Sequence, residues 1–211
     1  MKWEELLSEV GQEPVFGTGF LAASCKSMPY VRLQLSRWVK DGKLIQLRKG
    51  LYTLAQPYRK VAPHPFIIAN AMKKTSYVSL QSALAFYGMI PEHVPTVMST
   101  TTQRPEQVNT PLGGFRFRHI KKSWFHGYRQ TDLGQGQKAF IAIPEKALLD
   151  LVYLTPSSAD RDFLMELRLQ NLERLDGQVI LNIADASGSD KLRLAGGLIA
   201  ELIEQEIGEE L

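Results

Sequence analysis

The sequence predicts an α+β protein with a small N-terminal domain over residues 1–57 and a mixed α/β domain over residues 63–211. Three observations predict this fold class. Apolar residues recur at helical spacing near the N-terminus, two short alternating stretches follow, and Pro57, Pro63 and Pro65 then interrupt the pattern. Beyond these prolines, helical and strand-like stretches are mixed, as expected for an α/β domain.

The N-terminal domain is expected to contain three helices. An amphipathic helix over residues 3–9 is followed by a short extended piece at Val15-Phe16 and by a helix over residues 19–26. Ser27 is a capping residue with a proline soon after it, so a third helix starts there and ends before Gly42. The core face of this helix carries the apolar residues at the i, i+4, i+7 and i+8 spacing: Val31, Leu35, Trp38 and Val39.

A hairpin follows the third helix. Residues 44–48 and 51–54 alternate as strands do, and Lys49-Gly50 forms a tight turn between them. A helix, a glycine stop and a two-stranded hairpin with a basic tip are the order of a winged helix-turn-helix, in which the hairpin is the wing.

Basic residues are concentrated in the same region. Residues 26–60 contain nine basic residues and one acid, Asp41, whereas residues 131–211 contain seven basic and fifteen acidic residues. The net charge of +3 conceals this asymmetry. A surface this one-sided repels itself unless an anion neutralises it, and duplex phosphate is the expected anion.

The predicted DNA-binding residues lie on the third helix and on the wing. Arginine can read guanine, glutamine can read adenine, and hydroxyls and lysines can bind phosphate. The alternative is a solvated basic helix beside a hairpin, but the coincidence of the cluster with the helix–helix–wing order favours DNA. The candidates are Ser27, Tyr30, Arg32, Gln34, Arg37, Lys40, Lys43, Arg48 and Lys49.

The second domain is expected to combine helices with three strands. Strands are predicted over residues 94–101, 114–120 and 139–143, and the middle strand places Phe115 and Phe117 inward. The predicted helices cover residues 65–73, 79–88, 158–173, 176–186 and 190–207, with a further helix that begins at Pro144.

This domain contains a second basic set interleaved with aromatic residues. Such a set could follow a phosphate backbone or bind a partner, and its aromatic residues could equally belong to the core of a half-buried strand. The sequence leaves these two interpretations open. The set comprises Arg116, Arg118, Lys121, Lys122 and Arg129.

Signals of catalysis or metal binding are weak. The four histidines are scattered without an i, i+4 pair, and residues 134–138 lack the spacing of a phosphate-binding loop. Glu145 and Asp150 are expected to be a capping residue and a surface or salt-bridge carboxylate. We therefore expect no enzyme, no cofactor and no metal.

Cysteine content and hydropathy predict a cytoplasmic protein. The single cysteine, Cys25, excludes an internal disulfide, and we expect it to pack in the N-terminal domain rather than to sense redox state. No apolar run is long enough to span a membrane, and the acidic N-terminus is unlike a signal peptide.

Three segments together resemble the AbiEi-type antitoxins, a family of bacterial winged-helix regulators. These segments are LSRWVKDGKLIQLRKGLYTL, SYVSLQSALAFYGMIPE and AIPEKALLDLVYL, in the family's order, and the resemblance covers about residues 10–155. Lys43, Arg48, Lys49 and Gly50 match the family's wing, whereas the residues of the third helix occupy its variable recognition helix.

The resemblance implies a role in a toxin–antitoxin system. It implies a winged-helix domain joined to an α/β antitoxin domain, repression of the protein's own operon through inverted repeats, and a nucleotidyltransferase-type toxin as partner. The acidic residues after position 158 lie outside the resembling segments. Two alternatives stay open: an antitoxin that binds its toxin directly, and an orphan regulator without a toxin.

Overall fold

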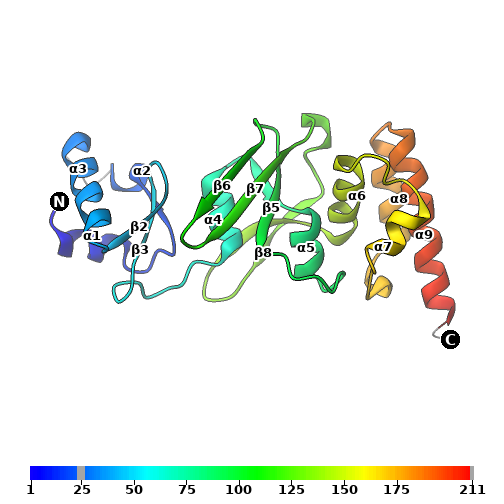
Figure 1. The fold of residues 1–211 in the computed structure, drawn as a ribbon, viewed down its shortest axis with the longest axis horizontal. Coiled ribbons are helices and arrows are strands. Elements are labelled where there is room, and N and C mark those ends of the chain that lie inside the picture. Colours follow the sequence, from blue (N-terminus) through cyan, green and yellow to red (C-terminus); the bar gives the residue numbers. More distant parts are fainter. Residues whose placement is uncertain (23–26, 210–211) are drawn as a thin grey trace.

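The computed structural model describes residues 1–22 and 27–209, and these form an α+β protein with three parts arranged along its longest axis (Figure 1). A small N-terminal unit occupies one end, a six-stranded sheet lies in the middle, and a group of helices occupies the other end. Cys25 and the second half of the helix predicted over residues 19–26 lie outside the described residues.

The N-terminal unit consists of helices and a three-stranded antiparallel sheet of order β1-β3-β2. Its third helix and its hairpin agree with the prediction to within a residue at each end. Its elements are α1 (Trp3–Val10), β1 (Phe16–Gly17), α2 (Thr18–Leu21), α3 (Met28–Lys40), β2 (Leu44–Arg48) and β3 (Leu51–Leu54).

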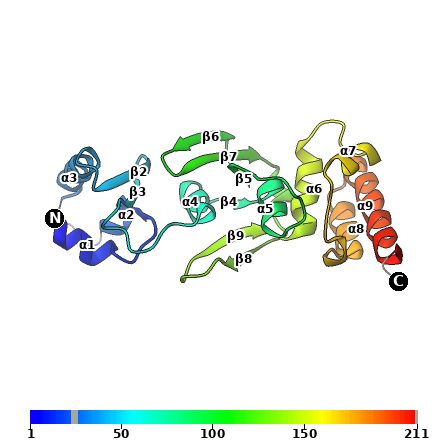
Figure 2. The same cartoon turned by 60° about the horizontal axis from the view of Figure 1, so that its bottom comes forward.

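The hairpin β2–β3 contributes to two hydrophobic cores. Leu44 and Leu54 pack with the buried faces of α1 and α3 in the core of the N-terminal unit. Leu47 and Leu51 belong instead to the larger core of the central sheet. Figures 1 and 2 show the hairpin on the side of the N-terminal unit that faces this sheet. The hairpin predicted to be the wing therefore also connects the N-terminal unit to the central sheet.

The central sheet has the strand order β6-β7-β5-β4-β9-β8. The pairs β5–β7 and β4–β9 are parallel, and the other neighbours are antiparallel. Phe115 and Phe117 are buried as predicted. The strands are β4 (Ser76–Val78), β5 (Thr96–Thr101), β6 (Glu106–Thr110), β7 (Gly113–His119), β8 (Tyr128–Asp132) and β9 (Lys138–Ala142).

Three of these strands, β4, β6 and β8, were not predicted. The central strand β4 has only three residues, too few to show an alternating pattern. Strands β6 and β8 lie at the two edges of the sheet and carry mostly polar residues. Their backbone hydrogen bonds to β7 and β9 hold them in place, and such bonds leave no periodicity in the sequence.

Helices α4 (Pro65–Met72), α5 (Leu80–Phe86) and α6 (Pro144–Leu154) pack against the sheet, and a short 3-10 helix, η1 (Lys122–Trp124), precedes β8. In Figure 2, α4 lies between the β6–β7 side and the β8–β9 side of the sheet. Helix α6 connects the sheet to the C-terminal helices.

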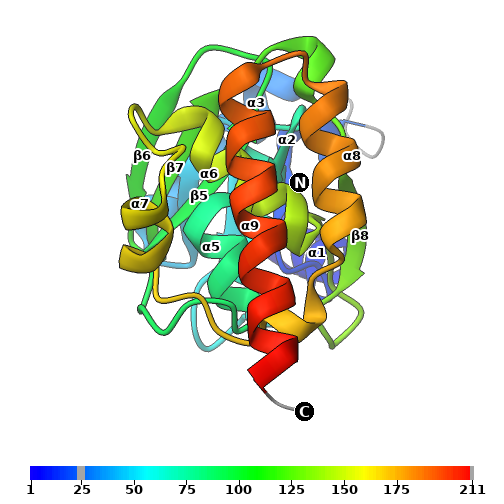
Figure 3. The same ribbon diagram turned by 90° about the vertical axis from the view of Figure 1, so that its right-hand side faces the viewer.

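The C-terminal end consists of α7 (Arg161–Glu166), the 3-10 helix η2 (Leu172–Arg174), α8 (Gly177–Ala186) and α9 (Asp190–Glu209). Figure 3 shows α8 and α9 side by side. They approach closely at Gly196, where an added Cβ would lie 2.9 Å from the Cβ of Ala184.

The single helix predicted over residues 158–173 is wrong. Helix α7 ends at Glu166, and the backbone turns left-handed at Arg168 and Asn171, with φ of 48° and 56°. Two contacts with the end of α5 explain the break. The Gln170 amide donates to the Met89 carbonyl at 2.9 Å, and the Asn171 amide side chain donates to the Gly88 carbonyl at 2.7 Å. Tertiary hydrogen bonds thus replace helical ones.

No helix in the described part of the chain is both long enough and apolar enough to cross a membrane.

Candidate nucleic-acid surface

Helix α3 is oriented by its apolar face. Val31, Leu35 and Trp38 are buried, and the Trp38 ring packs edge-on against Trp3 of α1 at 5.2 Å between centroids. Val39, predicted for the same face, is half-buried. Ser27 occupies the cap position, but its hydroxyl makes no capping hydrogen bond, which corrects that prediction.

The opposite face of α3 is open to solvent and combines basic with large apolar side chains. Tyr30 and Leu33 are 51% and 50% exposed. Of the predicted DNA-binding residues on this helix, Gln34 is half-buried and the others are exposed: Ser27, Tyr30, Arg32, Arg37 and Lys40. Guanidinium, ammonium, phenol and aliphatic groups on one helix face can contact both phosphates and base edges.

The hairpin turn is fixed against the rest of the N-terminal unit. Gly50 adopts φ +81°, a conformation that glycine allows, and its carbonyl accepts a hydrogen bond from the Thr18 amide at 2.9 Å. Lys49, next to it, is exposed. Lys43 lies at the base of the hairpin, with its ammonium 5.1 Å from the centroid of the Trp3 ring. Lys49 is therefore the basic residue at the tip.

One hollow joins α3 to the hairpin. It has a volume of about 490 Å³ and is lined by five residues, two of which are basic and none of which is acidic. Arg32 comes from α3 and Lys49 from the turn, so the fold brings together two residues that are 17 positions apart in the sequence. The lining residues are Thr18, Arg32, Lys49, Gly50 and Tyr52.

Arg48 differs from its neighbour Lys49. Its guanidinium donates to the carbonyl of Met72, at the end of α4, at 2.6 Å and pairs with Glu106 of β6 at 3.4 Å. Glu106 also pairs with Lys73 at 3.0 Å. Of these two candidate residues of the hairpin, Arg48 is thus bound to α4 and to the central sheet, and Lys49 has no ion pair among the described residues.

The five residues of the second basic set lie on different parts of the central sheet and its connections. Arg116 donates to the Gln107 side chain at 3.0 Å, and Arg118 donates to the Leu154 carbonyl at 3.1 Å. Lys121 and Lys122 are exposed beside or within η1. Arg129 lies on β8, at the opposite edge of the sheet from the β6–β7 side. These five residues do not form one continuous surface.

The aromatic residues of this region belong partly to the core. Phe117 is 1% exposed and Trp124 is 3% exposed, so neither offers a face on which a base could stack. The Lys73 ammonium lies 5.2 Å from the centroid of Phe117. For Phe117 and Trp124 the structure therefore favours the core interpretation that the sequence left open.

A buried polar network around Asp150 was not predicted. Its carboxylate forms an ion pair with Lys146, one helical turn earlier on α6, and both residues are fully buried. It also accepts hydrogen bonds from Ser79 at 2.7 Å, Tyr77 at 3.0 Å and the Trp124 indole at 2.7 Å. Asp150 was expected to be a surface or salt-bridge carboxylate, and the surface alternative is wrong.

The titration of this network follows from its burial. Desolvation lowers the pKa of Lys146, and it raises the pKa of Tyr77 together with the negative charge of Asp150. The Lys146 ammonium also lies 4.1 Å from the centroid of the Trp124 ring. Because the network is fully paired and closed to solvent, it stabilises the contact between α6 and the sheet and offers no access to a substrate.

Glu145, the second carboxylate on α6, is also buried. Its carboxylate accepts a hydrogen bond from the Asp176 amide at 3.1 Å, just before α8. It therefore fixes the start of another helix.

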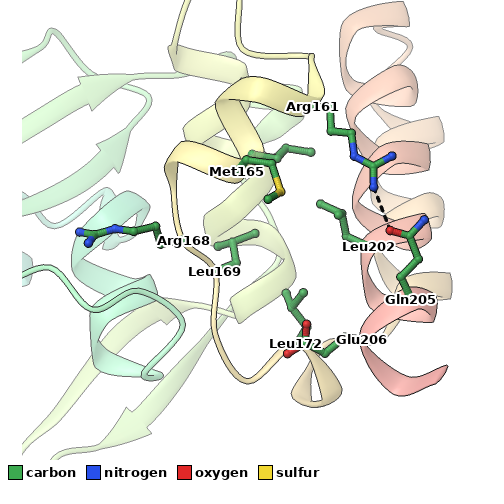
Figure 4. A pocket seen from close by; sticks show the side chains of 9 residues that line it. Arg161, Met165, Arg168, Leu169, Leu172, Leu202, Gln205 and Glu206 are labelled. Carbon is green, nitrogen blue, oxygen red and sulfur yellow. Dashed lines mark hydrogen bonds between the residues drawn. The ribbon is translucent and has the colours of Figure 1, made fainter. Parts of the chain in front are cut away.

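A groove at the C-terminal end lies between α7, η2 and α9 (Figure 4). It has a volume of about 260 Å³, and Met165 beside it is 60% exposed. Arg161 at its rim donates to Gln205 at 2.9 Å, and Arg168 pairs with Glu92. The groove is lined by four leucines and Met165 together with four polar or charged residues, a mixture that is common where a protein partner binds.

In the described part of the chain, no group of three or more His, Cys, Asp or Glu side chains is placed to hold a metal ion. No family model matches this chain, and no curated protein matches it either.

Proposed function

We propose that the N-terminal unit is a winged helix-turn-helix that binds duplex DNA, with α3 in the major groove and the hairpin turn on the phosphate backbone. The hollow shared by Arg32 and Lys49 supports this proposal best, because an arginine of α3 and a lysine of the hairpin turn line it together and none of its lining residues is acidic. The exposed Tyr30 and Leu33 add apolar groups that suit thymine methyls.

The biological role we propose is that of a cytoplasmic, non-enzymatic autorepressor in a toxin–antitoxin operon. This role is supported by the resemblance of the three sequence segments to AbiEi-type antitoxins. The fold contributes a separate structural unit at each end of the central sheet. One end would bind the promoter and leave the other free for a protein partner.

The test is a fluorescence-anisotropy titration with a 30-base-pair duplex from immediately upstream of the start codon. Each lost phosphate contact removes about 0.9 from the slope of log affinity against log salt, so at 0.1 M salt it costs about eightfold. The double variant Arg32→Glu/Lys49→Glu is expected to lose at least about fiftyfold and to show a slope smaller by about 2.

Arg174→Glu is the control for this titration, because Arg174 is an exposed cation of η2, which packs against α9 among the C-terminal helices. It is expected to bind like the wild type. An unchanged titration for the double variant would contradict the proposed DNA-binding surface. Arg37→Ala should weaken binding to the promoter duplex more than to a scrambled duplex, since a base-reading arginine discriminates by about 1–3 kcal/mol.

A second candidate function is direct binding of a basic protein, such as a nucleotidyltransferase-type toxin, at the C-terminal end. The groove between α7 and α9, with the exposed Met165 beside it, favours this alternative, as does the excess of acidic residues after position 130. Co-purification with the product of the neighbouring gene tests it. Met165→Lys should weaken such a complex, because it removes an exposed apolar contact and adds a charge that repels a basic partner, and it should leave DNA binding unchanged.

A further inference from the structure

A second hollow adjoins the proposed DNA surface at the boundary between the two domains. It has a volume of about 630 Å³, and it shares Thr18, Lys49 and Gly50 with the hollow beside α3. Its opposite wall comes from the end of α4 in the second domain and from the residue two positions beyond it: Ala71, Met72 and Lys74. The turn of the hairpin is therefore the ridge between two connected hollows.

The charged residues that line the two hollows are all basic. None of the residues that line either hollow is acidic. Arg32, Lys49 and Lys74 follow one another from α3 over the turn to the second domain, and all three are exposed. Within the part of the chain that the structure describes, none of them has an ion pair.

Lys74 differs from the residue before it. Lys73 is 7% exposed, pairs with Glu106 and donates to the Arg104 carbonyl at 2.8 Å, so its charge is already compensated within the fold. Lys74 is directed to the hollow instead. Phe20, also at this hollow, is 52% exposed, so the hollow offers an aromatic ring beside its cations.

The two walls of this hollow are held together. Arg48 bonds to the Met72 carbonyl and pairs with Glu106, while Leu47 and Leu51 enter the core of the second domain. The backbone at Lys74 is thus held in place relative to the backbone at Lys49 before any ligand arrives. Because the backbone on both sides is already in place, binding a regular polyanion orders only the cationic side chains.

We infer that duplex DNA crosses the domain boundary and that Lys74 is a phosphate contact contributed by the second domain. This inference rests on the proposed function and extends its surface. It assigns the contact with DNA from the second domain to the turn after α4 rather than to the second basic set. The cations form a row and not a single cluster, and such a row can contact successive phosphates along the DNA backbone.

The experiment uses the full-length chain and the same 30-base-pair promoter duplex, titrated between 0.05 and 0.3 M salt. Lys74→Glu is expected to lower the affinity at 0.1 M salt about eightfold and to reduce the salt slope by about 1, for promoter and scrambled duplexes alike. Lys74→Gln should reduce the slope by a similar amount. Thermal unfolding of both variants verifies that they are folded.

Lys122→Glu serves as the comparison, because Lys122 is an exposed lysine of the same domain that belongs to the second basic set. It is expected to bind like the wild type. If the Lys74 variants bind like the wild type while Arg32→Glu/Lys49→Glu loses binding, the inference is overturned and the proposed function stands. If the wild type itself shows no salt-dependent binding to duplex DNA, the proposed function fails.

Discussion

The exposed basic residues of the N-terminal unit and the buried network around Asp150 differ in whether their charges are paired within the protein. Arg32, Arg37 and Lys49 are exposed, and no ion pair is found for them among the described residues. Lys146 and Asp150 are fully buried and paired with each other. Charge that is paired inside the protein supports the fold, whereas charge left unpaired at the surface is available to an external anion.

Arg48 tests this comparison, because it lies in the basic region but is paired. Arg48 is next to Lys49 in the sequence. Its contacts with Met72 and Glu106, however, make it one of the charged residues that support the fold. Adjacent residues of one hairpin therefore belong to different functional classes.

The largest effect is expected for Asp150→Ala. The variant leaves the Lys146 ammonium buried without its carboxylate, and breaking a buried pair in this way costs about 3–5 kcal/mol of the free energy of unfolding. Urea denaturation measures the loss. The double variant Lys146→Met/Asp150→Leu should recover part of it, because it removes both charges. Glu201→Gln, an exposed carboxylate of α9, is the control and should change stability little.

A smaller effect on stability is expected when Arg48 and Lys49 are replaced by alanine one at a time. Arg48→Ala removes hydrogen bonds to a carbonyl and a carboxylate and should lower the free energy of unfolding by about 1–3 kcal/mol, since the pair is only half-buried. Lys49→Ala should change it by less than about 0.5 kcal/mol. In DNA titrations, Lys49→Ala should reduce the salt slope by about 1. Equal loss of stability in both variants would remove the distinction between the two residues.

The smallest effect is a change in pH dependence at His126. Partial desolvation of the imidazole, and then the positive charge of Lys146, lower the pKa of His126 below 6.5, and the negative charge of Asp150 opposes them. The unfolded chain therefore binds this proton more tightly, so this contribution to stability is present above pH 6.5 and is lost as the pH falls from 6.5 through the lowered pKa of the folded state.

The measurement compares urea midpoints at pH 7.5 and 5.5. His126→Gln should lose less stability on acidification than the wild type does. Burial also lowers the pKa of His64, which contributes with the same sign and is present in both proteins, so the slope should decrease without vanishing. Identical slopes for the two proteins would argue against this coupling.

Much of the N-terminal unit could be predicted from local signals. Ser27 and Gly42 bracket α3, and Lys49-Gly50 marks the turn, because caps, stops and tight turns depend on residues close in sequence. The strand β4 and the break after α7 could not be predicted in this way. Both depend on hydrogen bonds to distant partners, to β5 and β9 in one case and to the end of α5 in the other.

The candidate site was only partly predictable for the same reason. The sequence marks Arg32, Arg48, Lys49 and Lys74 as cations and gives no sign of their partners. Glu106, 58 residues after Arg48, pairs with it, whereas Lys49 and Lys74 converge on one hollow. Spatial neighbours at such separations depend on the sheet order β6-β7-β5-β4-β9-β8, which local periodicity does not specify.

The sequence by itself determined that this chain has an α+β fold, a basic front and an acidic rear, because composition and short-range periodicity fix charge distribution and element type. Only the tertiary structure decided which of those charges are used by the fold. Ion pairs and burial are properties of residues that meet in space. They separate Arg48, which binds the N-terminal unit to the central sheet, and Lys73, which is paired next to that sheet, from Lys49 and Lys74, which are exposed and line one hollow.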